Sequence, residues 1–291
     1  MNAYKYREPV KSQVRVIYKK CKTLLFLWKE KQLHWQDKTA AAKYGKRISN
    51  VIQYNKSKNY PESFSEKGSG RVAVYTCIFG NYDAVKPIGC KSKYCDYYII
   101  TDQAVDEKSG WKKLAVAFPE ELQDASPVLR NRYCKMHPHI LFPEYDYSIY
   151  MDGSIVIYAD IFPLLGRMGE KILGMYAHSS RDCIYQEAAK VVELGKAPKN
   201  IVDAQMSVYR QEGFPEHFGL TDGIVIARKH NEPRCVQLMQ DWWKLFCAYS
   251  KRDQLGLMYA VWKNGMAYSD IALLGANYQE DVRLKFAGHR K

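Results

Sequence analysis

The chain has 291 residues, of which 47% are hydrophobic and 13% aromatic, and its net charge is +13 at pH 7. This composition excludes a largely disordered chain and leaves room for one large domain with an appendage. Residues 1–60 hold 15 Lys or Arg against 3 Asp or Glu, a net +12, whereas residues 61–291 are nearly balanced at +1. This basic arm predicts a polyanionic partner, either an anionic membrane surface or nucleic acid.

Residues 14–31 of the arm predict a basic amphipathic helix with an apolar stripe beside its lysines. Lys19, Lys20 and Lys22 interrupt the apolar residues, so the segment is too short and too charged to span a bilayer. Such a helix can lie on an anionic membrane surface, or it can pack on the domain or on a partner. Nucleic acid is the weaker expectation, because the rest of the chain does not interleave aromatic and basic residues.

The eight cysteines form no CxxC pair, and Cys90 and Cys95 are spaced too loosely for a zinc knuckle. Most of the others lie in apolar runs, as reduced buried thiols do. We infer a reducing compartment. The expected location is therefore the cytoplasm, with the arm peripheral on the inner face of the membrane.

A polar stretch at residues 61–70 predicts a linker between the arm, residues 1–60, and one domain, residues 71–291. Strands are expected at residues 71–79, 97–101, 113–118, 147–151, 155–158, 172–177 and 223–227. Helices are expected at residues 126–137, 183–195, 201–213, 232–250 and 253–263. This alternation predicts an α/β fold with a largely parallel sheet flanked by helices.

Polar residues follow four of the expected strands, at residues 80–83, Asp102, Asp152 and His178. Ligands of open α/β sheets bind at the carboxyl ends of the strands, so these residues are candidates for one site. His178 is a candidate for catalysis there, although a lone histidine at a strand end can also be structural.

The triplet Asp152-Gly153-Ser154 interrupts an apolar region. In extended chain, Asp152 and Ser154 would face the same side and could bind a divalent cation that bridges phosphates, with Gly153 allowing close approach. The alternative is a hairpin turn, because Asp and Gly are both turn residues.

Arg130, Arg132 and Lys135 lie within two turns of the helix that precedes this triplet. They could clamp a diphosphate, or they could form a solvated helix face. Asp253 opens another expected helix, where it could act as the N-cap. Taken singly, none of these motifs identifies a reaction.

The order of the motifs is more specific. From about Val72 onward it resembles a glycosyltransferase-like domain family shared by plant cell-wall and mucilage proteins and bacterial polysaccharide clusters. More distantly, it resembles family 8 retaining glycosyltransferases. The segments that carry the resemblance are YTCIFGNYD, YYIITD, RNRYCKMHPHILFPEYDYSIYMDGSI, AHSSRDCIYQEA, QMSVYRQEGFP, GLTDGIVIARKHN and WWKLFCAYSKRDQLGLMYAVWKNG.

The resemblance implies a GT-A fold and transfer of a sugar from a nucleotide donor. It also implies which residues contact the ligands. The residues implied at the nucleotide and its diphosphate are Thr76, Phe79, Gly80, Tyr82, Asp83, Asp102, Arg130 and Lys135. The residues implied at the sugar or the acceptor are Asp222, Gly223, Asp253 and Gln254.

One departure concerns the metal, because the family 8 pattern expects a second carboxylate where this chain has Ser154, a weaker ligand. Either Asp152 and His289 bind Mn²⁺ or Mg²⁺ together with the diphosphate, or Arg and Lys side chains offset the charge of the leaving diphosphate without an essential metal. His289 could instead be an idle residue of a frayed terminus.

The expected function is transfer of a sugar from a UDP-sugar to a glycan or lipid-linked acceptor in surface polysaccharide biosynthesis. Retention of the anomeric configuration is implied only by the family 8 likeness. The alternative is a catalytically inactive protein of the same fold that acts as a binding or scaffold subunit, because Ser154 replaces a carboxylate.

Overall fold

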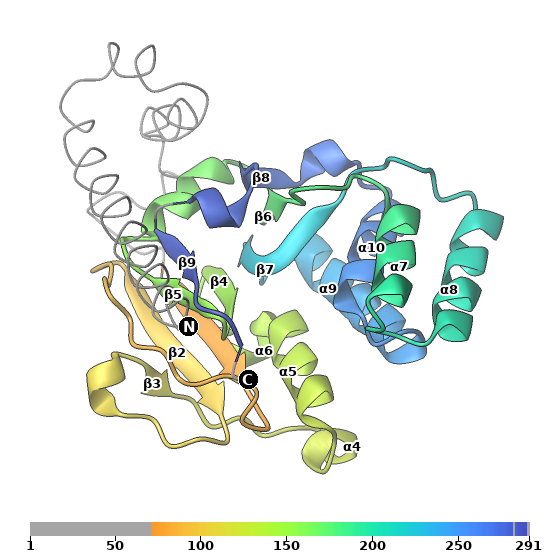
Figure 1. Cartoon of the computed structure of the whole chain (residues 1–291). Coiled ribbons are helices and arrows are strands. Elements are labelled where there is room, and N and C mark those ends of the chain that lie inside the picture. Colours follow the sequence, from red (N-terminus) through yellow and green to blue (C-terminus); the bar gives the residue numbers. More distant parts are fainter. Residues whose placement is uncertain (1–70, 282, 290–291) are drawn as a thin grey trace, which may run out of the picture. The chain divides into compact units, whose positions relative to one another are not determined.

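The computed structural model describes residues 71–281 and 283–289, so the predicted arm and linker lie outside the described residues. In this part of the chain, one seven-stranded sheet has the order β3-β2-β1-β4-β7-β6-β8, and a separate sheet pairs β5 with β9 (Figure 1). The strands are β1 (Val72–Ile78), β2 (Cys95–Thr101), β3 (Lys112–Lys113), β4 (Tyr147–Asp152), β5 (Ile155–Ile157), β6 (Leu173–Ala177), β7 (Thr221–Arg228), β8 (Ala272–Gly275) and β9 (Leu284–Phe286).

Strand β7 is antiparallel to both of its neighbours, β4 and β6, whereas the other pairs of the large sheet are parallel. Because β7 is reversed, its amino end lies at the same edge as the carboxyl ends of β4 and β6. Asp222 accordingly pairs with Tyr176, and Val225 pairs with Met151. The expected class, α/β with a mixed and largely parallel sheet flanked by helices, is confirmed.

Both faces of the sheet are covered, which explains why the strands read as continuous apolar runs. Along β1, Tyr75 and Cys77 join the core on one face, and Val74 and Ile78 join the core on the other. The helices are α4 (Glu120–Gln123), α5 (Pro127–Met136), α6 (Pro138–Leu141), α7 (Ile184–Glu193), α8 (Lys199–Gln211), α9 (Pro233–Ala248) and α10 (Leu257–Lys263). In Figure 1, α7 to α10 form one group and α4 to α6 another.

Helix α5 begins where the sequence predicts. The Ser126 hydroxyl accepts a hydrogen bond from the Leu129 N–H at 3.3 Å, and Pro127 occupies the first turn. The helix packs on β1 and α9. This packing places the last turn of α5 over the end of β4, where the candidate site lies.

The structure differs from the sequence predictions in several elements, and strand β8 and the short helices α4 and α6 were not predicted. The strand predicted at residues 113–118 is wrong for most of its length, because β3 is only Lys112–Lys113. The helix predicted at residues 253–263 is interrupted at Gly256, which separates a short 3₁₀ helix, η4 (Asp253–Leu255), from α10. Strand β9 was not predicted, and it pairs antiparallel with β5.

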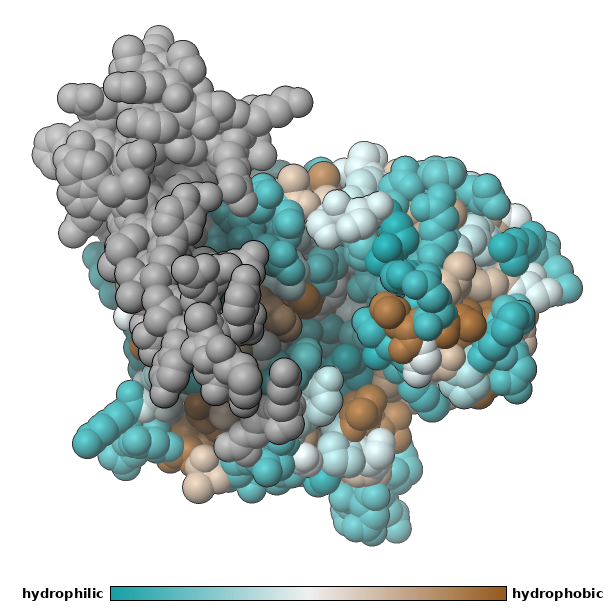
Figure 2. Space-filling model, in the orientation of Figure 1, coloured by the Kyte–Doolittle hydropathy of each residue, from teal (hydrophilic) through white to brown (hydrophobic). Residues whose placement is uncertain are grey.

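Hydrophilic residues dominate the visible surface of the described part, and apolar residues are exposed there in small separate groups (Figure 2). Among the described residues, no helix combines the length and apolar character needed to cross a membrane. The cysteines of this part are unpaired, and Cys77, Cys134, Cys183 and Cys235 are buried, as the sequence predicts.

Candidate active site

Four elements bring charged side chains together at the carboxyl edge of the sheet. Asp152 ends β4, Asp222 lies at the start of β7, Asp253 begins η4 and Lys135 lies in the last turn of α5. Lys135 Nζ is 2.7 Å from Asp253 Oδ2 and 3.7 Å from Asp152 Oδ1. One ammonium group thus links carboxylates that are far apart in the sequence.

Arg132 contributes a second cation, with its Nε 3.0 Å from Asp253 Oδ2. Residues three apart share a helix face, so Arg132 and Lys135 reach the same site. Arg130 points elsewhere, and its guanidinium carbon lies 5.2 Å from the centre of the Phe79 ring. The structure therefore favours Arg132 over the predicted Arg130, and the three-residue spacing to Lys135 was the sequence signal that could have identified it.

Lys135 is buried, with a side chain only 1% exposed, and it faces the rings of Tyr150 and Trp242. Its counter-ion Asp253 has a side chain 10% exposed. Burial acts to raise the pKa of Asp253, but the charges of Arg132 and Lys135 outweigh burial and hold this pKa well below its usual range. Lys135 therefore positions the carboxylates instead of reaching the solvent.

The alternative that Asp253 caps a helix is not borne out. The N-cap of η4 is Arg252, and no side chain caps this end. The backbone carbonyl of Asp253 accepts a hydrogen bond from Trp242 Nε1 at 2.8 Å, and Gln254 Nε2 donates to the Thr221 carbonyl. Hence η4 is fastened to α9 on one side and to the start of β7 on the other.

Asp222 and Gly223 lie beside these charges. Burial raises the pKa of Asp222 to about 6, and the charge of Asp152 adds to this increase. A Cβ atom on Gly223 would lie 3.3 Å from Lys135 Nζ and 3.8 Å from Gln254 Oε1. Gly223 therefore lies against polar groups of the cluster, and a side chain there would crowd the Lys135 ammonium group.

The Asp152-Gly153-Ser154 triplet is a strand end followed by a turn, so the predicted extended geometry is wrong, and the hairpin alternative is right about the turn but not about the hairpin. Ser154 is only 1% exposed, in contrast to the half-buried Asp152. Gly153 is needed for packing, because a Cβ there would lie 2.7 Å from Ile78 Cγ1. The turn connects β4 to β5 and does not form a hairpin.

The loop after β1 brings several predicted residues together. Gly80, at φ +63°, donates its N–H to Asp102 Oδ2 at 2.8 Å. His289 Nδ1 lies 3.1 Å from Oδ1 of the buried Asp83, so His289 has a contact within the site. Tyr82 is 63% exposed, and its ring centre lies 4.9 Å from that of His289.

Three predicted residues lie apart from these groups. Thr76 is buried within β1, and Phe79 is buried in the core, so neither forms part of an open loop. His178 Nδ1 accepts hydrogen bonds from the backbone N–H groups of Ser180 and Arg181. These bonds favour the structural alternative for His178, which stabilises its own loop.

A divalent cation at this site would need ligand atoms from Asp152 and His289. The described residues contain no group of three or more His, Cys, Asp or Glu side chains that could hold a metal ion. Asp152 Oδ1 accepts a hydrogen bond from the Tyr150 hydroxyl at 2.7 Å, while His289 contacts Asp83. Lys86 Nζ donates to the Gly153 carbonyl at 3.1 Å. Asp152 and His289 thus each contact another protein group, and these contacts disfavour the Mn²⁺ or Mg²⁺ site that the sequence predicts.

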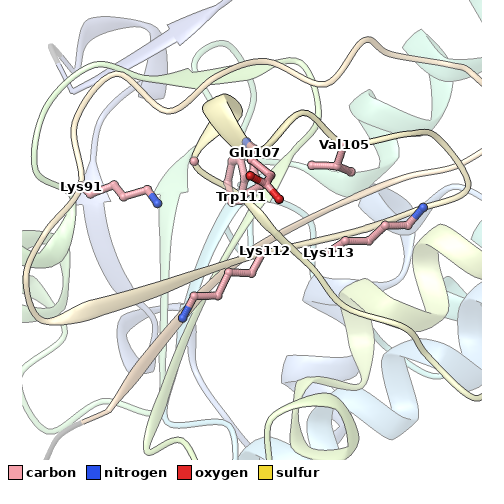
Figure 3. Close-up of a pocket in the computed structure, with 7 residues that line it drawn as sticks. Lys91, Val105, Glu107, Trp111, Lys112 and Lys113 are labelled. Carbon is pink, nitrogen blue, oxygen red and sulfur yellow. The ribbon is translucent and has the colours of Figure 1, made fainter.

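A cavity of about 390 Å³ lies elsewhere, at the β3 edge of the sheet, and none of the predicted site residues lines it. Its lining residues are Lys91, Val105, Glu107, Gly110, Trp111, Lys112 and Lys113. Figure 3 shows that the three lysine side chains extend in different directions. Lys112 and Lys113 already donate hydrogen bonds to other residues. The cavity is therefore not a convergent anion site.

Comparison with known proteins identifies one family. Residues 59–279 match the model described as "TOD1/MUCI70, glycosyltransferase-like domain". The "Probable hexosyltransferase MUCI70" of Arabidopsis thaliana is 24% identical over an alignment of 213 residues, and the match covers 63% of this chain and 36% of the relative. The match thus spans little more than a third of that relative.

Two solved glycosyltransferase structures also show similarity. The apo structure of the bifunctional WbbM has a TM-score of 0.45 and 12% identity, over 72% of this chain and 40% of WbbM. The galactosyltransferase LgtC, in complex with donor and acceptor sugar analogues, has a TM-score of 0.41 and 10% identity, over 69% of this chain and 72% of LgtC. The family model itself covers every strand from β1 to β8. The chain belongs to the TOD1/MUCI70 glycosyltransferase-like domain family.

Proposed function

We propose that the protein is a glycosyltransferase that moves a hexose from a nucleoside-diphosphate donor, UDP by preference, to a glycan or lipid-linked acceptor. The observation that carries the proposal is the charge cluster of Arg132, Lys135, Asp152, Asp222 and Asp253 in a member of this family. Negative charge develops on a departing diphosphate, and fixed cations stabilise it.

The geometry supports a division of roles. The nucleoside would bind near Asp102 and the exposed ring of Tyr82. Arg132 would contact the diphosphate, and the sugar hydroxyls would bind beside Asp222 and Gly223. Asp222, with a pKa of about 6, is suited to accept the proton of the acceptor hydroxyl.

The first test is release of UDP from UDP-glucose and UDP-galactose, with and without added oligosaccharides. We expect Arg132→Met to reduce release by about 100-fold, as loss of a transition-state contact does. Lys113→Met, at the β3 edge, is the matched control and should retain full activity. No donor binding and no release from any nucleotide sugar would contradict the proposal.

A second candidate, a binding or scaffold protein without transfer activity, is favoured by one observation: the buried Ser154 stands where a second carboxylate was expected. Tight binding of a nucleotide sugar with no hydrolysis and no transfer would support this candidate. We also propose that the enzyme acts in surface polysaccharide biosynthesis at the cytoplasmic face of a membrane, to which the basic arm binds.

A further inference from the structure

We propose that Lys86, together with Arg132, binds the donor diphosphate and supplies the positive charge that a divalent cation would otherwise supply. Donor binding is then independent of metal. This inference rests on the proposed function and concerns the same site, to which the sequence predictions did not assign Lys86.

Lys86 lies next to the turn that follows β4. Its Nζ donates a hydrogen bond to the Gly153 carbonyl at 3.1 Å, one residue beyond Asp152, and the side chain is half-buried. A carbonyl is neutral, and within the described ranges no carboxylate forms an ion pair with this ammonium group. Lys135 is paired with Asp253, whereas Lys86 has no carboxylate in direct contact among the described residues and can offer its ammonium group to a ligand.

The loop that carries Lys86 is fixed on both sides. Trp111 Nε1 donates to the Lys86 carbonyl at 2.8 Å, and Gln103 Nε2 donates to the Asp83 carbonyl at 2.7 Å. The Gly89 N–H donates to the Ile157 carbonyl at 2.8 Å. A cation held in place before the ligand arrives binds with little further loss of conformational entropy.

The surroundings of Asp152 disfavour a divalent cation. Lys135 Nζ lies 3.7 Å from Asp152 Oδ1, and the same oxygen accepts the Tyr150 hydroxyl. A metal ion bound to Asp152 would be close to the buried ammonium group of Lys135 and would be repelled by it. The neighbouring Lys86 would add to this repulsion.

Phosphate oxygens are natural partners for the cations that remain accessible. Arg132 has a side chain 22% exposed, so it can contact a ligand at the cluster, in contrast to Lys135. A guanidinium group can bind two phosphate oxygens, and an ammonium group binds phosphate as a point charge. Lys86 and Arg132 together can therefore offset the two phosphates of a nucleoside diphosphate.

The experiment measures the Kd of UDP and of inorganic pyrophosphate for the full chain by calorimetry, in EDTA and again with Mn²⁺. We expect equal Kd values in the two conditions, within about twofold. Lys86→Met should weaken binding about tenfold, or about 1.4 kcal/mol. Lys86→Arg should retain most of the affinity because it keeps the charge. Lys91→Met, in the same segment but away from the turn, is the matched control.

Thermal unfolding of each variant separates loss of binding from loss of fold. Binding that requires Mn²⁺ would overturn the inference and leave the proposed function standing. Unchanged binding by a folded Lys86→Met protein would overturn the role of Lys86. If UDP, pyrophosphate and nucleotide sugars fail to bind in either condition, the proposed function falls, and the inference falls with it.

Discussion

At the scale of single residues, the site depends on charges that are buried and paired. Lys135 and Asp253 form a contact of 2.7 Å, and Arg132 shares the same carboxylate oxygen. Removing one partner of such a pair leaves an uncompensated charge in a region of low dielectric constant. Each member of the pair therefore affects both stability and activity.

Asp253→Asn should lower the free energy of unfolding by about 3 kcal/mol, because a neutral amide leaves Lys135 without its counter-ion. Urea denaturation followed by circular dichroism measures this change. Asp241→Asn, which removes a more exposed partner of Lys244, is the control and should cost less than about 1 kcal/mol. Equal stability of the Asp253→Asn and wild-type proteins would contradict the role given to the buried pair.

The carboxyl group of Asp222 predicts a pH dependence. Burial raises its folded-state pKa to about 6, and it is surrounded by Asp152, Lys135, Asp253 and Tyr278. Because the folded pKa lies above the unfolded value, Asp222 should reduce stability progressively as the pH rises from about 4 to 6. If Asp222 is the base, kcat/KM should rise over the upper part of this range.

Asp222→Asn should abolish this rise in kcat/KM and should be more stable than the wild-type protein at pH 7. The two proteins should differ less at pH 4, where Asp222 is largely protonated in the folded state and about half protonated in the unfolded state, so that most of its destabilising effect is absent. Thermal unfolding and UDP release over this pH range provide both measurements. A rise in kcat/KM that persists in the variant would exclude Asp222 as the titrating group.

At the scale of elements, the turn after β4 is shaped by packing. A Cβ on Gly153 would lie 2.7 Å from Ile78 Cγ1, so Gly153→Ala should displace the turn and lower stability by about 1–3 kcal/mol. The displaced turn should also weaken donor binding. Ile78→Ala in the same chain removes the obstruction and should recover part of that affinity. Denaturant unfolding and calorimetry measure the two effects, and full affinity in Gly153→Ala would show that the turn can adapt.

Most elements could be predicted because the sheet is covered on both faces and its strands form continuous apolar runs. The direction of β7 could not be predicted, since a run such as residues 223–227 looks the same whichever way the strand points. The short strands were mispredicted for another reason: β3 was predicted too long, and β8 and β9 were not predicted. Each has too few residues for a pattern to appear, and β9 is defined by its partner β5.

At the scale of the whole molecule, the sequence predicts which residues carry charge but not which of them meet. The contacts of Lys135 with Asp253 and of Lys86 with Gly153 join segments that are distant in the chain. The sequence pattern could identify Asp152 as a site residue because it ends a strand. It could not identify Lys86, because nothing local marks a lysine whose partner is a backbone carbonyl.

The uneven charge of the chain leads to a prediction about its location. Residues 1–60 carry a net +12, and deleting them should abolish binding to vesicles that contain phosphatidylserine while sparing UDP release from a soluble donor. Sedimentation with vesicles measures the binding, which should weaken as salt increases. Neutral vesicles are the control, and unchanged sedimentation of the shortened protein would contradict a membrane role for the arm.

The pairing of β9 with β5 also has a consequence for biosynthesis. A ribosome synthesises β5 long before β9, so the emerging chain exposes the edge of β5 until residues 284–286 leave the exit tunnel. The contact between Asp83 and His289 also cannot form until residue 289 has left the exit tunnel. The loop after β1 should therefore gain its contact with His289 only after residues 283–289 have been synthesised, and chains terminated before these residues should be prone to aggregate through β5.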